Sequence, residues 1–356
     1  MKKSIIGLFV LIVVLSGCNI AEPVGKSEIK ITDALEREVT FDTFPEKIVI
    51  AGKQTPMLVN FTYMFEGAPK KILAIEKRSQ SGIEFLTILD KGVKEKYAIE
   101  KGAGAEQIAP LTPDLVILKT SMQETIGEQL EMIEIPVIYV SFESIEEIYR
   151  DVRIIGTVMN ESERAEEIIK YFQAVYEGVK KTIFDTKTEP KDSVLMIQAL
   201  DENQKYVFSV PSEKWLQTSL VEEAGAIPIW KGGGFSGGWN EVNFEQIAAW
   251  DPDHIFIINY QGEATLIKEN LLDDPLWQEL DAVKNGHIQV IPFDYISWDQ
   301  PDPRWILGFQ WLAEQVNSVA IFEGDFFDQV SGFYTLIFNV PEDIVKKEIF
   351  QMLRIN

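Results

Sequence analysis

Short apolar runs alternate with amphipathic segments along the first part of the chain. Four runs have the length of buried strands, at residues 48–50, 72–75, 115–118 and 137–140. Apolar residues at helical spacing lie between and after them, at 55–65, 123–133 and 144–159. Strands that alternate with helices predict a mainly parallel sheet with helices on both faces.

The same alternation returns in the last part of the chain. Apolar runs predict strands at 194–197, 206–208, 255–258 and 289–291. Helical patterns are present at 215–223, 243–249 and 304–316. Two more amphipathic segments close the chain, at 326–338 and 343–353. We therefore expect a second α/β lobe that ends in a helical tail.

One long helix is predicted between the two lobes, over 162–184. Ser162 can cap its start, no proline interrupts it, and its apolar residues recur at a spacing of three and four. A helix of about 23 residues is roughly 34 Å long, so we expect a rigid connector. The expected boundaries are a first lobe over 31–160, a connecting helix over 161–187 and a second lobe over 188–356.

The N-terminus has the pattern of an export signal. Lys2 and Lys3 precede an apolar run over 5–15, which is too short for a permanent membrane span. The run ends in Leu-Ser-Gly-Cys at 15–18, and Cys18 is the single cysteine of the chain. This junction resembles the lipobox of bacterial lipoproteins, which implies a signal peptide over 1–17, cleavage before Cys18 and lipidation of its thiol. Residues 18–30 would then tether an extracytoplasmic protein to the cell membrane.

One sequence motif occurs twice in the chain. Residues 106–118 and 245–257 both begin Glu-Gln-Ile-Ala, continue through a Pro-Asp turn and end in an apolar strand. The repeat indicates two similarly built lobes with equivalent acidic tips at Glu106 and Glu245. The alternative is that helix, Pro-Asp turn and strand form a common α/β connection, and that both glutamates are ordinary residues of a helix start.

The charge of the chain narrows the choice of partners. The formal net charge is −23, and 46% of the residues are apolar. An acidic globular protein of this kind lacks the basic surface that nucleic acid requires, and it favours a cationic docking partner. No second apolar segment is long enough to span a membrane.

With these features, the chain resembles the helical-backbone group of solute-binding proteins of ABC importers. The resemblance is carried by the two Glu-Gln-Ile-Ala phrases, by residues 135–140 and by residues 301–308. It implies two Rossmann-like α/β lobes joined by a single long helix, with the ligand cleft between them and little hinge motion. It also implies a monomer without enzymatic activity or cofactor, in which Glu106 and Glu245 pair with arginines of the permease dimer.

The loops that follow the predicted strands hold the candidate ligand-binding residues, because ligands of α/β lobes bind beyond the carboxyl ends of strands. The first lobe contributes cations and polar groups: Lys53, Gln54, Arg78, Ser79 and Lys119. The second lobe contributes mostly aromatic residues: Trp215, Trp239, Tyr295, Trp298 and Arg304. In the resemblance, Trp239 and Arg304 correspond to a tryptophan and an arginine of the pocket.

Cations together with aromatic faces suit an anionic metal chelate of the iron-siderophore, haem or cobalamin type. Each residue also has a structural alternative: the tryptophans can pack in the core, and Arg304 can pair with Asp299 or Asp302. A bare metal ion is not expected, because His254 and His287 are far apart in sequence.

Two other functions stay open at this point. An oxyanion such as molybdate or tungstate suits the glycine-rich stretch at 232–238, the loop at 79–82 and Arg304. A cell-surface enzyme is the remote alternative, since the chain has no nucleophile elbow, nucleotide loop or metal-ligand cluster.

Overall fold

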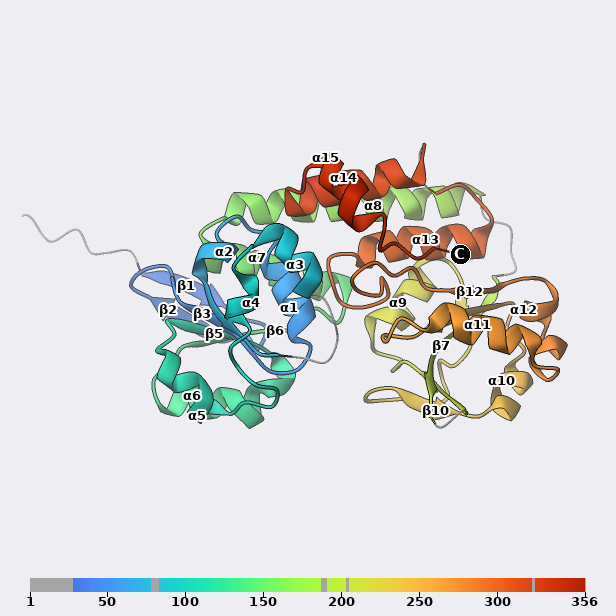
Figure 1. Cartoon of the computed structure of the whole chain (residues 1–356), viewed down its shortest axis with the longest axis horizontal. Coiled ribbons are helices and arrows are strands. Elements are labelled where there is room, and N and C mark those ends of the chain that lie inside the picture. The colour runs from blue at the N-terminus through green and yellow to red at the C-terminus, as the bar shows by residue number, and fades with distance from the viewer. Residues whose placement is uncertain (1–27, 78–82, 187–190, 203–204, 322–323, 356) are drawn as a thin grey trace, which may run out of the picture.

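The computed structural model describes residues 28–77, 83–186, 191–202, 205–321 and 324–355. Cys18, Arg78 and Ser79 lie outside these residues. Within the described residues, no helix combines the length and apolarity needed to cross a membrane. Two α/β lobes lie side by side beneath a long helix (Figure 1).

The first lobe is built on a parallel sheet with the order β4-β3-β5-β6. Its strands are β3 (Ile48–Ile50), β4 (Ile72–Ile75), β5 (Leu115–Lys119) and β6 (Val137–Val140). All four match the predicted runs, because buried parallel strands are apolar on both faces. An antiparallel hairpin of β1 (Ile29–Thr32) and β2 (Glu38–Phe41) precedes the sheet.

The helix predicted at 144–159 of the first lobe is confirmed, whereas the patterns at 55–65 and 123–133 form shorter helices. The helices of this lobe are α1 (Thr55–Thr62), α2 (Ala68–Lys71), α3 (Ile83–Leu89), α4 (Val93–Lys96), α5 (Ala105–Ile108), α6 (Glu128–Met132) and α7 (Ile145–Met159). Residues 123–133 were expected to form one helix. They divide instead into a π-helical turn, Gln123–Gly127, and α6. Short 3₁₀ turns follow α5 and β5, at Ala109–Leu111 and Thr120–Met122.

The second lobe has a mixed sheet with the order β10-β8-β7-β11-β12, and β9 pairs with β7. Its strands are β7 (Ser193–Asp201), β8 (Tyr206–Val210), β9 (Ile227–Pro228), β10 (Asn240–Val242), β11 (His254–Ile258) and β12 (Ile288–Val290). β9, β11 and β12 continue the parallel arrangement with β7, whereas β8 and β10 run antiparallel to their neighbours. The carboxyl ends of β7, β11 and β12 therefore define one edge of this sheet.

Helices cover the second sheet and extend into the tail. They are α9 (Leu216–Glu223), α10 (Phe244–Trp250), α11 (Ala264–Asp273), α12 (Asp281–Lys284), α13 (Trp305–Asn317), α14 (Phe326–Phe338) and α15 (Glu342–Ile344). A 3₁₀ turn, Trp277–Glu279, precedes α12, and a π-helical turn, Val345–Ile349, follows α15.

The connector is α8 (Ser162–Thr186), which buries one stripe of apolar residues. It packs against α7 of the first lobe and α13 of the second, and α14 lies along it (Figure 1). The predicted fold of two α/β lobes joined by a single long helix is confirmed.

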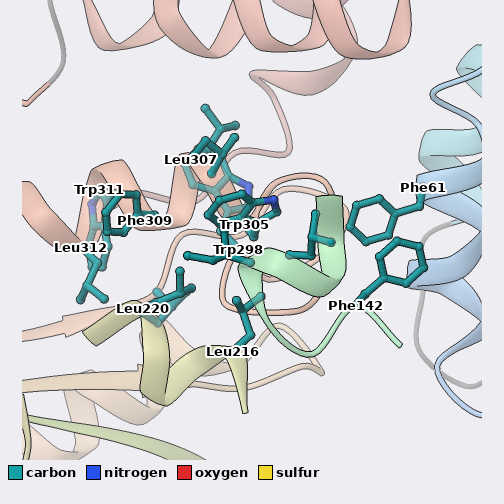
Figure 2. Close-up of a cluster of buried hydrophobic side chains, with 14 of the residues drawn as sticks. Phe61, Phe142, Leu216, Leu220, Trp298, Trp305, Leu307, Phe309, Trp311 and Leu312 are labelled. Carbon is teal, nitrogen blue, oxygen red and sulfur yellow. The ribbon is translucent and has the colours of Figure 1, made fainter. Parts of the chain in front are cut away.

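The lobes share one continuous apolar core. A single cluster of buried residues includes Ile48 and Phe61 of the first lobe, Phe172 of α8, and Trp305 and Ile257 of the second lobe. Figure 2 shows part of this cluster, with Phe61 and Phe142 of the first lobe on one side and Trp298 and Trp305 of the second lobe near the middle. The rings of Phe61 and Phe142 stack with centroids 3.9 Å apart. The buried apolar residues of both lobes and α8 thus form one cluster.

Candidate functional site

The candidate site lies at the carboxyl ends of the parallel strands in each lobe, where α/β sheets bind ligands. In the first lobe, the loop after β3 contains Gly52, Lys53 and Gln54. The buried Glu76, directly after β4, accepts the backbone N–H of Gly52 at 2.6 Å and that of Gly102 at 2.8 Å. One carboxylate therefore shapes the loop that presents Lys53 and Gln54.

Lys53 and Gln54 differ in their surroundings. Lys53 is exposed, and no described carboxylate lies within ion-pair distance of it. Gln54 is half-buried, has a left-handed backbone with φ 57°, and precedes the first residue of α1. Its Oε1 is buried and has no hydrogen-bond partner among the described residues. Lys53 therefore keeps an exposed charge, whereas Gln54 Oε1 is a buried acceptor without a described partner.

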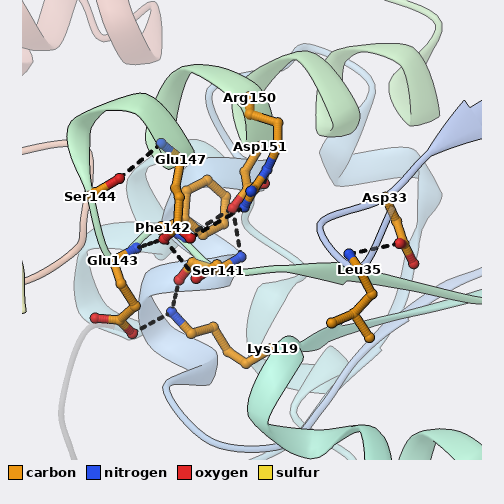
Figure 3. A network of polar contacts seen from close by, with 10 residues as sticks. All are labelled: Asp33, Leu35, Lys119, Ser141, Phe142, Glu143, Ser144, Glu147, Arg150 and Asp151. Atoms are coloured by element: carbon orange, nitrogen blue, oxygen red, sulfur yellow. Dashed lines mark hydrogen bonds and ion pairs between the residues drawn. The ribbon is translucent and has the colours of Figure 1, made fainter. Parts of the chain in front are cut away.

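Lys119, at the end of β5, was expected to offer its charge to the ligand. It is buried, donates to the Ser141 carbonyl and forms an ion pair of 2.8 Å with Glu143 (Figure 3). Asp151 fixes the same loop by accepting the backbone N–H groups of Ser141 and Phe142. The charge of Lys119 is thus neutralised within the protein, which corrects the expectation.

The second lobe presents an aromatic wall made of Trp215, Trp239 and Tyr260. Trp215 precedes α9, Trp239 precedes β10, and Tyr260 follows the carboxyl end of β11. The Trp215 and Trp239 rings meet edge to face at 5.8 Å, and Trp239 meets Tyr260 in the same way at 6.1 Å. All three residues are half-buried.

Tyr260 connects the aromatic wall to the buried carboxylate of Asp299. Its hydroxyl donates to Asp299 at 2.8 Å, Gln217 donates to the same oxygen at 3.2 Å, and Ser297 donates to the other oxygen. Asp299 is 2% exposed. Burial raises the pKa of Asp299, and the hydrogen bonds from Ser297, Tyr260 and Gln217 oppose that shift. Sequence patterns missed Tyr260, although its place two residues after the strand 255–258 was a usable signal.

Arg304 and Trp298 lie in the interior rather than in a ligand site. Arg304 is fully buried and pairs with Asp294 at 3.1 Å and with Asp302 at 2.9 Å. Trp298 is also fully buried, and its indole N–H donates to Asp294 at 3.2 Å. Both residues were expected to contact the ligand, but each is fully buried and bonded to Asp294 instead. Asp299 and Asp302 were the two structural partners considered for Arg304, and Arg304 forms an ion pair with Asp302.

The Arg304 cluster also joins the lobes. Its guanidinium lies 4.3 Å from the ring centroid of Phe85 in α3. Burial by itself lowers the pKa of Arg304, but Asp294, Tyr334 and Asp302 raise it overall, so its positive charge is secure. Tyr295, another predicted ligand residue, is half-buried beside Phe85 and donates its hydroxyl to the Glu348 carbonyl at 3.1 Å.

The two histidines, distant in sequence, are neighbours in space. His254 and His287 stack with centroids 4.4 Å apart at the amino ends of β11 and β12. His254 Nε2 lies 3.2 Å from a carboxylate oxygen of Asp192. In the part of the chain that the structure describes, no group of three or more His, Cys, Asp and Glu residues is arranged to hold a metal ion.

The two repeated glutamates are both exposed. Glu106 lies in the first turn of α5, and Glu245 lies in the first turn of α10. Asn243 caps α10 by accepting the backbone N–H of Gln246 at 2.9 Å. Both helices lie on the side of the lobes that faces away from α8 (Figure 1).

A separate cavity of about 760 Å³ lies between the first lobe and the tail. Its walls include Tyr63, Ile88 and Leu89 on one side and Phe338 and Ile344 on the other. It does not coincide with the strand ends that carry the aromatic wall. The candidate site at the strand ends is thus separate from this cavity.

Comparison with known proteins identifies the family. Residues 95–295, more than half of the chain, match the family described as periplasmic binding protein. The chain belongs to this family. Its members bind solutes and are not enzymes, so the enzyme alternative is excluded.

Curated relatives of this periplasmic binding protein cover most of its length. It is 25% identical over 84% of its chain to the "Probable siderophore-binding lipoprotein YfiY" of Bacillus subtilis, covering 93% of that protein. It is 27% identical to the "Fe(3+)-citrate-binding protein YfmC" of the same organism, over 65% of this chain and 75% of the relative. It is 21% identical to the "Molybdate-binding protein MolA" of Haemophilus influenzae, over 85% and 89%.

Solved structures show the same fold. The TroA-like periplasmic binding protein FepB from Veillonella parvula aligns with a TM-score of 0.73 and 19% identity, covering 88% of this chain and 97% of that one. The structure of MolA bound to molybdate aligns with a TM-score of 0.70 and 18% identity, covering 87% and 98%. These alignments support the two-lobed architecture.

Proposed function

We propose that this protein is the extracytoplasmic binding component of an ABC importer and that its ligand is a metal chelate of the iron-siderophore type. The observation that carries the proposal is the aromatic wall of Trp215, Trp239 and Tyr260 at the carboxyl edge of the second sheet. Aromatic faces suit the organic envelope of a chelate. Relatives named for siderophores, Fe(3+)-citrate, petrobactin and iron(3+)-hydroxamate support the same ligand class.

A fluorescence titration tests the chelate. Ferric hydroxamate, ferric catecholate, ferric citrate, haem and cobalamin are added one at a time, and quenching of tryptophan emission is followed. A ligand should give saturable quenching in the wild type. Trp239→Phe should lower the affinity for that ligand, whereas Trp250→Phe, a half-buried tryptophan that meets Phe235 outside the wall, should not. Failure of every chelate to bind would refute the proposal.

An oxyanion is the second candidate, supported by the likeness to the molybdate-binding protein. Molybdate and tungstate are compact anions held by hydrogen-bond donors and need no aromatic wall. A thermal-shift assay separates the candidates. A ligand at about a hundred times its dissociation constant should stabilise the folded state by about 2.7 kcal/mol. Stabilisation by molybdate and by none of the chelates would favour the oxyanion.

The proposed permease contacts are Glu106 and Glu245. Both are exposed in first helical turns, where the helix dipole favours a carboxylate, and arginines can bind such groups bidentately. Replacement of both by Ala should abolish uptake and leave ligand affinity unchanged. Replacement of Glu128 and Glu269, two other exposed glutamates, serves as the control. Unchanged uptake by the Glu106/Glu245 variant would refute these contacts.

The proposed membrane anchor is Cys18. Its place in Leu-Ser-Gly-Cys and its status as the single cysteine support lipidation, and one relative is named a lipoprotein. Labelled palmitate should be incorporated into the wild type and not into Cys18→Ala. The variant should also leave the membrane fraction. Membrane association and labelling that survive the substitution would refute the anchor.

A further inference from the structure

Asp299 differs from the other buried aspartates of the protein. Five of them form an ion pair with a lysine or arginine, at N···O distances between 2.6 and 3.1 Å. These are Asp33, Asp90, Asp151, Asp294 and Asp302. Asp299 is equally buried, yet no described lysine, arginine or histidine lies within ion-pair distance of it. Its partners are the neutral side chains of Ser297, Tyr260 and Gln217.

A buried carboxylate without a cation is costly, because burial removes the water that would otherwise stabilise its charge. The fold supplies a cation in the five other cases. At Asp299, it supplies hydrogen-bond donors and an aromatic neighbour instead. Such an arrangement leaves negative potential at the position of Tyr260, whose hydroxyl already directs its proton to Asp299.

The aromatic wall adds to that potential. Ring faces carry partial negative charge and attract organic cations, as in aromatic cages for ammonium groups. Trp215 meets Trp239 at an interplanar angle of 79°, and Trp239 meets Tyr260 at 65°. Successive rings thus meet edge to face and form one continuous aromatic surface. A carboxylate behind such walls favours a cation over a neutral group or an anion.

We propose that Asp299, Tyr260 and the tryptophans Trp215 and Trp239 form a subsite for an organic cationic group of the ligand. The proposal rests on the proposed function and narrows it to metal chelates that carry an ammonium group. The ammonium would lie against the aromatic wall, with the Tyr260 oxygen as an acceptor and the Asp299 carboxylate as the counter-charge.

The proposed cationic subsite also changes the charge expected of the ligand. The anionic chelate was inferred from cations in the strand-end loops, and two of these, Lys119 and Arg304, are neutralised by Glu143 and by Asp294 and Asp302. Asp299 of the second lobe has no cationic partner among the described residues, so this carboxylate favours a chelate that has a positive group at one end.

A matched pair of ligands tests the subsite. The probes are a linear ferric trihydroxamate with a free terminal ammonium and the same chelate with that amine acetylated. The wild type should bind the ammonium form about tenfold more tightly. Asp299→Asn should bind both forms with the affinity of the acetylated one. Glu241→Gln, which alters an exposed carboxylate of the same lobe, should keep the wild-type preference.

Tyr260→Phe provides a second variant if Asp299→Asn fails to fold, and it should reduce the preference several-fold. Equal affinity of the wild type for both probes would overturn the cationic subsite and leave the chelate-binding function intact. A preference that survives in both Asp299→Asn and Tyr260→Phe would also overturn it. If the wild type binds neither probe nor any chelate of the earlier titration, the proposed function itself fails.

Discussion

The side-chain amide of Asn60 in α1 donates a hydrogen bond of 2.5 Å to Asp302, across the boundary between the two lobes. Both residues are buried, and Asp302 also accepts from Arg304. This bond ties the first helix of one lobe to the loop that begins α13 in the other. A polar contact at such a place fixes the relative position of the lobes more specifically than apolar packing does.

Asn60→Ala should lower the free energy of unfolding by about 1–3 kcal/mol, because Asp302 loses a partner in the interior. Urea unfolding followed by tryptophan fluorescence measures the change. Asn285→Ala, at an exposed asparagine after α12, is the control and should change it by under about 0.5 kcal/mol. Equal stability of the two variants would show that the bond contributes nothing to the interface.

Arg304→Ala should be more damaging, at about 3–5 kcal/mol, since it leaves Asp294 and Asp302 buried without a counter-charge. Arg153, which pairs with Glu166 on the surface, is the matched control. Its replacement by Ala should cost less than about 1 kcal/mol. The same urea titration compares them. If Arg304→Ala has wild-type stability but has lost ligand affinity, Arg304 is a ligand-binding residue and its structural role is refuted.

Gly52→Ala tests the loop after β3. Gly52 has φ +86°, and a Cβ added there would lie 2.7 Å from Cγ of Met122. We expect a loss of stability of about 1–3 kcal/mol from the backbone conformation and the steric clash. The double variant Gly52→Ala/Met122→Ala removes the clash and keeps the strained φ, so thermal unfolding of both variants separates the two effects. No loss in the single variant would contradict this geometry.

His254 should make stability depend on pH. Its pKa is lowered from the usual 6.5, first by burial and further by His287, against the opposing effect of Asp192. Below the unfolded-state pKa, the unfolded chain binds a proton more readily than the folded one. Stability is therefore lost as the pH falls below about 6.5 toward the lower folded-state pKa, with a slope of at most about 1.4 kcal/mol per pH unit for one group.

The measurement is chemical unfolding of the wild type and His254→Gln at several pH values between about 5 and 8. The carboxylates titrate in both proteins, so the difference between the two curves isolates His254. The wild type should lose stability relative to the variant as the solution is acidified. Parallel curves would show that His254 has the same pKa in the folded and unfolded states.

Local patterns were enough to predict the sheets and the connector. The repeated Glu-Gln-Ile-Ala sequence predicts α5 before β5 and α10 before β11. It does so because helix starts and buried strands are determined by residues that are neighbours in the sequence. The hairpin of β1 and β2 left no such signal, since its strands are short and include charged residues such as Lys30 and Glu38.

The candidate site was harder to predict, because it depends on contacts between distant segments. Arg304 and Trp298 have the composition of ligand-binding residues, and only their packing against Asp294 shows that they are structural. Tyr260 and Asp299 lie 39 residues apart, so their hydrogen bond cannot be predicted from a local sequence pattern. The stacking of His254 on His287 is invisible to sequence patterns for the same reason.

The core shared by both lobes and α8 has a consequence for cooperativity. Halves cut at residues 187–190 would each expose the apolar surface that Phe61, Phe172 and Trp305 now bury together. Neither half would hold its native conformation alone, and calorimetry of the intact chain should show one heat-absorption peak rather than two.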